Sequence, residues 1–215
     1  MPVNAKICGL NHPAAVAAAI AGGASHLGFN FYPPSPRSID PLKAASLAAG
    51  VPLGIVKVGL VVDASDEEIA RILSEAKLDM LQLHGDETPR RVKDVRRKFG
   101  KPVMKALRVA SAADIAAADE YLPTVDWLLF DAKPPPELKN ALPGGNAISF
   151  DWSLIAGRGW SKPWMLSGGL NVGNLADAVR TTGAKTVDVA SGVEDSPGRK
   201  SPDKIAAFLK LAASL

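Results

Sequence analysis

Residues 56–84 read VKVGLVVDASDEEIARILSEAKLDMLQLH, and we expect the whole fold to be built from units of this kind. The first seven residues are apolar at most positions, which is typical of a strand buried on both faces. A helical pattern follows near 66–77, and a second apolar run begins at Met80. A strand, a helix and another strand in this order predict parallel pairing through a right-handed crossover.

The same unit recurs along the whole chain. Candidate strands lie at 5–9, 26–31, 56–62, 80–84, 103–108, 127–131, 163–167 and 186–190. Candidate helices lie near 13–22, 40–49, 66–77, 88–99, 112–119, 150–157, 173–182 and 202–213. Eight strands alternating with eight helices in 215 residues predict one domain, 1–215, folded as an α/β (β/α)8 TIM barrel. The alternative is an open doubly wound sheet, which rarely needs eight strands at this length.

The composition excludes several classes of protein. Hydrophobic residues make up 47% and charged residues 22%, which argues against disorder. The net charge of +3 without a basic block argues against a nucleic-acid partner. The segment from Ala14 to Ala24 is too short to cross a membrane and is typical of an alanine-rich helix. Because the single cysteine permits no internal disulfide, we expect a cytoplasmic enzyme without a membrane partner.

Two strand ends carry residues suited to proton transfer, and barrel enzymes place their chemistry at strand ends. Cys8 ends the first strand, and Asp131 ends the sixth after three large apolar residues. A buried aspartate needs a partner or keeps its proton. A protonated carboxyl can act as a general acid and a thiolate as a general base. The alternatives are that Cys8 is a small core residue and that Asp131 caps a loop.

The last two strands end in turns suited to a phosphate group. Gly168 and Gly169 follow the seventh strand, and Ser191 and Gly192 follow the eighth. Paired loops at these positions commonly bind phosphate in barrels, since glycines let backbone N–H groups approach the oxygens. Asp188, inside the eighth strand, is expected either to bind a ligand in the barrel mouth or to be paired internally.

Two long proline-rich loops, 32–40 and 132–149, follow strands and are expected on the face where active sites assemble. Arg37 in the first loop has a planar guanidinium group whose donors suit a carboxylate. The alternative is that Arg37 is a solvated loop residue. His84 ends the fourth strand. It could be a catalytic base, a ligand contact or a structural histidine, and the residue pattern alone favours a structural histidine. The three histidines have no spacing suited to ligation, so we expect no metal.

Seven segments resemble the phosphoribosylanthranilate isomerase family, in the order in which that family carries them. They are Lys6-Ile7-Cys8-Gly9, Gly28-Phe29 followed by Ser35-Pro36-Arg37-Ser38, Leu81-Gln82-Leu83-His84-Gly85, Leu129-Phe130-Asp131, Phe150-Asp151-Trp152, Ser167-Gly168-Gly169-Leu170, and 187–194 (VDVASGVE). The first segment, the Ser-Pro-Arg loop and the last segment are specific to the family. The double glycine and the histidine strand are not specific by themselves.

The resemblance implies a cofactor-independent Amadori rearrangement of N-(5-phosphoribosyl)anthranilate in tryptophan biosynthesis. By this resemblance Asp131 is the general acid that opens the ribose ring, and Cys8 is the general base that removes the C2 proton. Arg37 holds the anthranilate carboxylate, and Asp188 lies near the reacting amine. His84 belongs with the substrate contacts, and the turns at 168–169 and 191–192 hold the phosphate. Acid and base are expected on opposite walls, and the enzyme is expected to be a monomer or homodimer.

One segment departs from the family pattern, and two other functions compete. The family carries Gly-Gly-Thr-Gly where this chain has Gly144-Gly145-Asn146-Ala147, which puts the conformation of that loop in doubt. One competitor is the related sugar-phosphate isomerase of histidine biosynthesis, which has an aspartate at the position of Cys8. The other is a non-catalytic phosphate-binding barrel. Only the presence of both Cys8 and Asp131 at strand ends argues against it.

Overall fold

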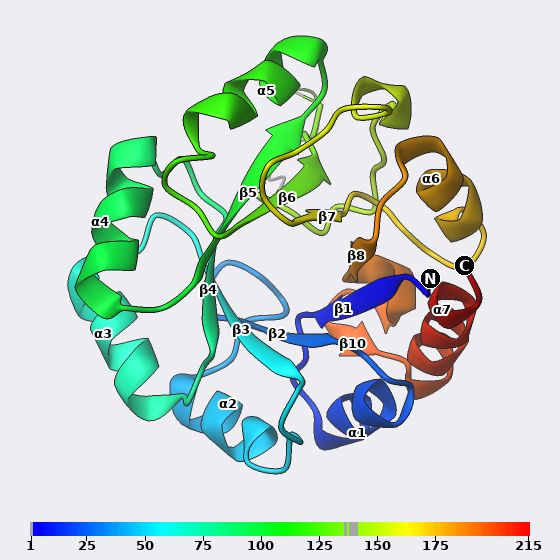
Figure 1. The fold of residues 1–215 in the computed structure, drawn as a ribbon. Helices are drawn as coiled ribbons and strands as arrows, with labels where there is room; N and C mark the ends of the chain where they lie inside the picture. The colour runs from blue at the N-terminus through cyan, green and yellow to red at the C-terminus, as the bar shows by residue number, and fades with distance from the viewer. Residues whose placement is uncertain (1, 136, 138–141) are drawn as a thin grey trace.

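The computed structural model describes residues 2–135, 137 and 142–215, and its centre is a closed barrel of parallel strands (Figure 1). The strands are β1 Asn4–Cys8, β2 His26–Asn30, β3 Val56–Val61, β4 Met80–Leu83, β5 Val103–Val109, β6 Trp127–Ala132, β7 Trp164–Leu166 and β8 Thr186–Val189. Each strand pairs with its neighbour in chain order, and β8 pairs back with β1. The predicted eight-stranded barrel is therefore confirmed.

Helices surround the barrel on all sides (Figure 1). They are α1 Pro13–Ala21, α2 Pro41–Ala48, α3 Asp66–Glu75, α4 Pro89–Phe99, α5 Ala112–Ala116, α6 Leu175–Thr182 and α7 Pro202–Ser214. Helix α3 begins at a capping box, in which Ser65 accepts from the N–H of Glu68 and Glu68 accepts from the N–H of Ser65. None of the helices in the described ranges has the length and apolar character that crossing a bilayer requires.

The helix expected near 150–157 does not form. The structure has only a 3-10 helix, η2 Trp152–Leu154, in which Asp151 caps the first turn by accepting from the N–H of Ser153. The helix does not continue, because Gly157 turns the chain at φ 70°. The helix expected near 112–119 is α5 followed by a 3-10 helix, η1 Ala117–Glu120. A small hairpin, β9 Glu194–Ser196 and β10 Arg199–Lys200, was not predicted, since its strands are too short to show a pattern.

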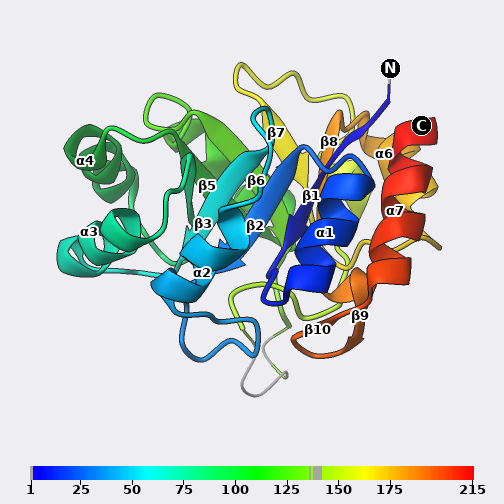
Figure 2. The same ribbon diagram turned by 90° about the horizontal axis from the view of Figure 1, so that it is seen from below.

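The alternation of side chains along each strand divides the core into two parts. Outward-facing side chains such as Ile7 and Phe29 pack against the helices in the larger apolar cluster. Inward-facing side chains form a smaller cluster of Val58, Met80, Met104, Ala106, Leu129 and Met165. In Figure 2 the N-terminus lies at the upper side and the β9–β10 hairpin, which follows β8, at the lower side. The carboxyl ends of the strands therefore open on that lower side.

The inward-facing His26 is a buried histidine whose titration affects stability. Its ring lies edge-on to Trp127 with centroids 5.5 Å apart, and its Nδ1 is 2.9 Å from the Oγ of Ser25. Burial, followed by the charge of Lys6, lowers the pKa of His26 to about 4. The unfolded chain therefore binds this proton more readily than the folded chain between about pH 4 and about pH 6.5.

We expect acid to destabilise the fold through His26. Lowering the pH from 7 to 5 is expected to cost about 2 kcal/mol of unfolding free energy through this group. Urea unfolding at both pH values measures the loss, and His26→Gln provides the comparison, since it lacks the titrating group. An equal loss in the wild type and in His26→Gln would show that the titration lies elsewhere.

Candidate active site

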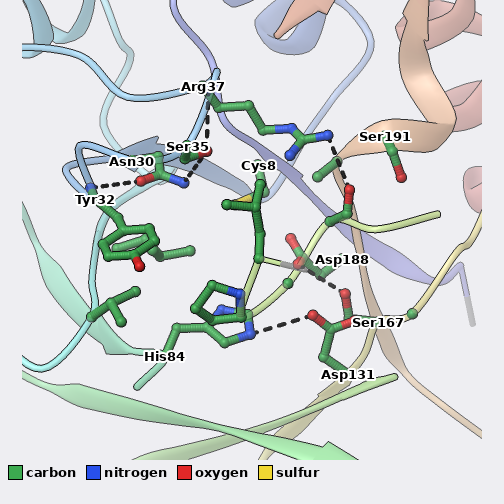
Figure 3. A pocket seen from close by; sticks show the side chains of 18 of the residues that line it. Cys8, Asn30, Tyr32, Ser35, Arg37, His84, Asp131, Ser167, Asp188 and Ser191 are labelled. Carbon is green, nitrogen blue, oxygen red and sulfur yellow. Dashed lines mark hydrogen bonds and ion pairs between the residues drawn. The ribbon is translucent and has the colours of Figure 1, made fainter. Parts of the chain in front are cut away.

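A cavity opens at the carboxyl ends of the strands. Both long loops contribute to it, as expected from their positions after β2 and β6. The lining residues are Cys8, Asn30, Tyr32, Ser35, Arg37, Leu60, Val62, His84, Asp131, Leu142, Pro143, Gly144, Gly145, Ser167, Gly168, Gly169, Leu170, Asp188, Ala190 and Ser191. In Figure 3, His84 and Asp131 lie at the lower side of this cavity, Arg37 at the upper side, and Cys8 between them.

Cys8 lies at the carboxyl end of β1, and the residue is 5% exposed. Gly28 on the neighbouring strand makes this possible, because a Cβ there would stand 3.0 Å from the sulfur. Gly9 follows at φ 76° and turns the chain out of the barrel. Burial raises the pKa of the thiol above its ordinary value, although the nearby charge of Lys6 acts in the opposite direction. Cys8 therefore faces the cavity mainly as a thiol near neutral pH.

Asp131 faces the same cavity and contacts a histidine. Its Oδ2 lies 3.3 Å from the Nε2 of His84, which is ion-pair distance without the alignment of a hydrogen bond. Its Oδ1 accepts from the N–H of Ala132 at 2.9 Å. The Nδ1 of His84 lies 3.0 Å from the Nε2 of Gln82, which fixes the imidazole ring. His84 is therefore held against the carboxyl group and is not an isolated core residue.

Cys8 and Asp131 were expected on opposite walls of the barrel, and the structure places them on different walls that are not diametrically opposite. Strands β7 and β8 stand between β6 and β1 on the shorter path around the barrel. The two side chains therefore face the cavity from different walls, but these walls are not diametrically opposite. A ligand between them is approached from two directions, as proton donation and proton removal at different atoms require.

Arg37 is almost fully buried and is held by an acid that the sequence reasoning did not single out. Its Nε and Nη2 donate to the two oxygens of Glu194 at 2.8 and 2.9 Å, and Nη2 also donates to the carbonyl of Gly145 at 3.2 Å. The Nζ of Lys200 also donates to the Oε1 of Glu194, at 2.8 Å. Burial opposes the charge of Glu194, but hydrogen bonds from Arg37 and Lys200 hold its pKa below the ordinary value. The guanidinium is thus fixed before any ligand arrives.

The two predicted phosphate turns meet at one side of the cavity. Gly168, Gly169 and Ser191 line it, whereas Gly192 lies behind them, where a Cβ would collide with the carbonyl of Leu170. Within the described part of the chain, the N–H groups of all four residues donate to no protein acceptor. Unused N–H groups from two adjacent turns form a site suited to an anion.

Asp188 is paired internally, which was one of its two expected roles. Its Oδ1 accepts from the Nζ of Lys6 at 2.9 Å, and its Oδ2 accepts from the Oγ of Ser167 at 3.2 Å. The residue also lines the cavity, so the pairing leaves it accessible to a ligand.

The loop that departs from the family pattern packs closely on the site. A Cβ at Gly144 would collide with the Oδ2 of Asp131 and stand 2.8 Å from the Nε2 of His84, so any larger residue there would displace these two side chains. Asn146 exchanges two hydrogen bonds with the backbone of Leu142, and Ala147 has a left-handed φ of 59°. The loop thus has a conformation that a glycine at 147 would adopt without strain. Pro136 and residues 138–141 lie outside the described residues.

Three contributing residues were not identified as site residues from the sequence. Lys6 precedes Cys8 by two residues on β1 and pairs with Asp188, Glu194 holds Arg37, and Gly144 contacts Asp131. The alternation along the first strand gives a signal for Lys6, because residues two apart share a face. Across the described residues, no group of three or more histidine, cysteine or acidic side chains is arranged to hold a metal ion.

Comparison with known proteins shows likeness over the whole chain. A family model described as N-(5'phosphoribosyl)anthranilate (PRA) isomerase matches residues 5–211. An N-(5'-phosphoribosyl)anthranilate isomerase from Rhodospirillum centenum is 57% identical over 215 residues, which cover 100% of both chains.

Two solved structures show the same fold. One is a phosphoribosyl anthranilate isomerase in complex with reduced 1-(o-carboxyphenylamino)-1-deoxyribulose 5-phosphate. It has a TM-score of 0.82 at 31% identity and covers 99% of this chain and 100% of its own. The other contains monomers generated from the dimeric enzyme of Thermotoga maritima. It has a TM-score of 0.83 at 32% identity with the same coverage.

Proposed function

The chain belongs to the N-(5'-phosphoribosyl)anthranilate isomerase family, and from this premise we propose how its cavity carries out the isomerisation in tryptophan biosynthesis. The substrate, N-(5-phosphoribosyl)anthranilate, is an aminoaldose, and the product is the ketose 1-(2-carboxyphenylamino)-1-deoxyribulose 5-phosphate. The rearrangement moves protons and leaves the overall oxidation state unchanged. It therefore needs an acid, a base and tight binding, which the side chains of one cavity can supply.

Asp131 is the proposed general acid for ring opening. Its carboxyl group donates a proton to the ribose ring oxygen, the C1–O bond breaks, and the lone pair of the anthranilate nitrogen forms a C1 iminium ion. His84 lies 3.3 Å from this carboxyl and restricts its orientation. Gly144 packs over both groups, which limits the access of water to the acid.

Cys8 is the proposed general base for the second step. Its thiolate removes the C2 proton, and the electron pair neutralises the iminium ion to give an enolamine. Tautomerisation of the enolamine then yields the C2 ketone. Because the thiol is buried, its raised pKa makes the thiolate a strong base once it forms.

Binding groups hold the two ends of the substrate. We assign the phosphate to the N–H groups of Gly168, Gly169, Ser191 and Gly192, which have no protein acceptor among the described residues. We assign the anthranilate carboxylate to Arg37, whose guanidinium lines the cavity. Asp188 and His84 lie between these ends and contact the ribose and the amine.

A single observation carries this proposal: Cys8, Asp131 and the unused N–H groups of two turns line one cavity in a member of this family. The experiment is to follow the fluorescence of phosphoribosylanthranilate after the protein is added. Loss of fluorescence at a rate proportional to enzyme supports the proposal. A protein that binds phosphate without this loss is the non-catalytic barrel, and one that isomerises only the substrate of histidine biosynthesis is the other competitor.

Arg37 is expected to recognise the carboxylate and not the rest of the substrate. Replacing Arg37 with alanine is expected to weaken binding of a carboxylate-bearing product analogue by about 1.5–3 kcal/mol. The same replacement is expected to weaken binding of the corresponding carboxamide much less. Inhibition constants for both ligands measure the difference, and Arg37→Ala/Glu194→Gln repeats the test without an unpaired buried carboxylate. An equal loss for both ligands would place the carboxylate elsewhere.

We propose that residues 1–215 act as one domain, as a monomer or homodimer, without a cofactor, a nucleic acid or a membrane. Support for a single domain comes from the cavity, whose lining residues are drawn from the chain between Cys8 and Ser191. We place the enzyme in the cytoplasm, because a reducing compartment keeps Cys8 available as a base.

A further inference from the structure

The barrel contains a buried lysine, Lys6, two residues before the proposed base on β1. The reaction described above assigns no role to this lysine. Lys6 has a side chain that is 0% exposed, and its Nζ lies 2.9 Å from the Oδ1 of Asp188. Burying an ammonium group costs several kcal/mol unless partners compensate for the lost hydration. A buried charge of this kind in the middle of an active-site wall calls for a functional explanation.

Lys6 and Cys8 share one space inside the barrel. They lie two residues apart on β1, so both side chains point inward, whereas Ile7 between them points to the helices. A Cβ at Gly28 would stand 3.0 Å from the sulfur of Cys8 and 3.2 Å from the Cε of Lys6. The missing side chain of Gly28 thus leaves the room that both residues occupy.

The other charges near the thiol come from several elements. Asp188 faces it from β8, and Lys200 faces it from β10 with its ammonium engaged by Glu194 and the carbonyl of Ala190. Arg37, His84 and Asp131 line the same cavity from other walls. His26 lies beside Lys6, where its lowered pKa keeps it neutral near pH 7. Lys200 gives two of its three donors to Glu194 and the carbonyl of Ala190, and Arg37 gives its Nε and Nη2 to Glu194. Lys6, in contrast, gives one of its three donors to Asp188.

We propose that Lys6 is a positioning residue whose buried ammonium, held by Asp188, supplies the positive charge that stabilises the Cys8 thiolate. This role rests on the proposed function of Cys8 as the base. Burial raises the pKa of Cys8, and the charge of Lys6 is the largest opposing influence. Burial lowers the pKa of Lys6, but the charges and hydrogen bonds of Asp188 and of the Cys8 thiolate together raise it above its ordinary value, so the positive charge persists where the enzyme works. Asp188 would then hold Lys6 in its charged form in addition to contacting the ligand.

The single cysteine allows a test that does not depend on catalysis. The rate of iodoacetamide alkylation is followed by mass spectrometry over a pH series, and the midpoint of its rise reports the titration of Cys8 alone. Lys6→Met is expected to move this midpoint upward by about 1–3 pH units. The rise of kcat/KM with pH is expected to move upward by the same amount. Cys8→Ser, which cannot be alkylated, gives the background.

A further pair of variants and a control double variant keep the test decisive if Lys6→Met folds poorly. Asp188→Asn and Lys6→Met/Asp188→Asn differ only at Lys6 and leave no unpaired carboxylate, so the double variant is expected to have the higher midpoint. Lys105→Met/Glu87→Gln removes another buried pair, with Nζ and Oε2 2.7 Å apart, on the outer side of the barrel. It is expected to leave the midpoint unchanged.

The outcomes separate this proposal from the assignment of Cys8. Equal midpoints in Asp188→Asn and the double variant would overturn the role of Lys6, even if Cys8 is the base. An equal shift in the Lys105 pair would also overturn it, because the effect would then follow from destabilisation in general. A shifted midpoint with a fully active Cys8→Ser enzyme would support the electrostatic effect and remove Cys8 from the reaction.

Discussion

Replacing Asp131 with asparagine is expected to lower kcat by a factor of about 10² to 10⁴, the range typical of general acid catalysis. The amide has nearly the shape of the carboxyl group but no proton to give to the ribose ring oxygen. Its oxygen can still accept from the N–H of Ala132, as the Oδ1 of Asp131 does at 2.9 Å. The loss is therefore expected in turnover and not in folding.

The measurement is steady-state turnover together with binding of a product analogue. Product binding is expected to change little, because the phosphate and carboxylate contacts remain. Asp177→Asn is the matched control, since Asp177 lies on α6 and pairs only with Arg180 among the described residues. Near wild-type turnover in Asp131→Asn would remove Asp131 from the role of acid, and a loss of product binding would make it a binding residue.

Replacing Cys8 with serine is expected to lower turnover by a similar factor of about 10² to 10⁴. A hydroxyl group is far less acidic than a thiol, so serine rarely provides the conjugate base that removes the C2 proton. The two side chains have nearly the same shape, and Gly28 leaves room for either. Folding and product binding are expected to persist.

The pH dependence of the wild type provides a second measurement for Cys8. Because burial raises the pKa of the thiol, kcat/KM is expected to rise with pH through the neutral and mildly alkaline range. Cys8→Ser is expected to lack this rise. Full activity in the variant would make Cys8 a core residue, and so would a wild-type thiol that iodoacetamide reaches only after denaturation.

The regular part of the fold could be predicted from the sequence because each element buries a characteristic pattern. The run 56–62 is apolar on both faces, and a parallel strand between a packed interior and a layer of helices requires this. The segment 150–157 was misjudged, because an apolar run of that length also suits a capped turn. Asp151 caps the start of a 3-10 helix of only three residues, and the chain turns away at Gly157 soon after it.

The sequence by itself determined the barrel, the two strand-end residues Cys8 and Asp131, and the two glycine turns. These features depend on local pattern and on the rule that strand ends share one face of a barrel. The tertiary structure alone decided which charges meet. It placed Glu194 on Arg37, Lys6 on Asp188 across 182 positions of sequence, and Gly144 over Asp131. The pair of Lys6 with Asp188 arises because the closing of the barrel brings β8 against β1, and no local pattern encodes a pairing between residues so far apart in the chain.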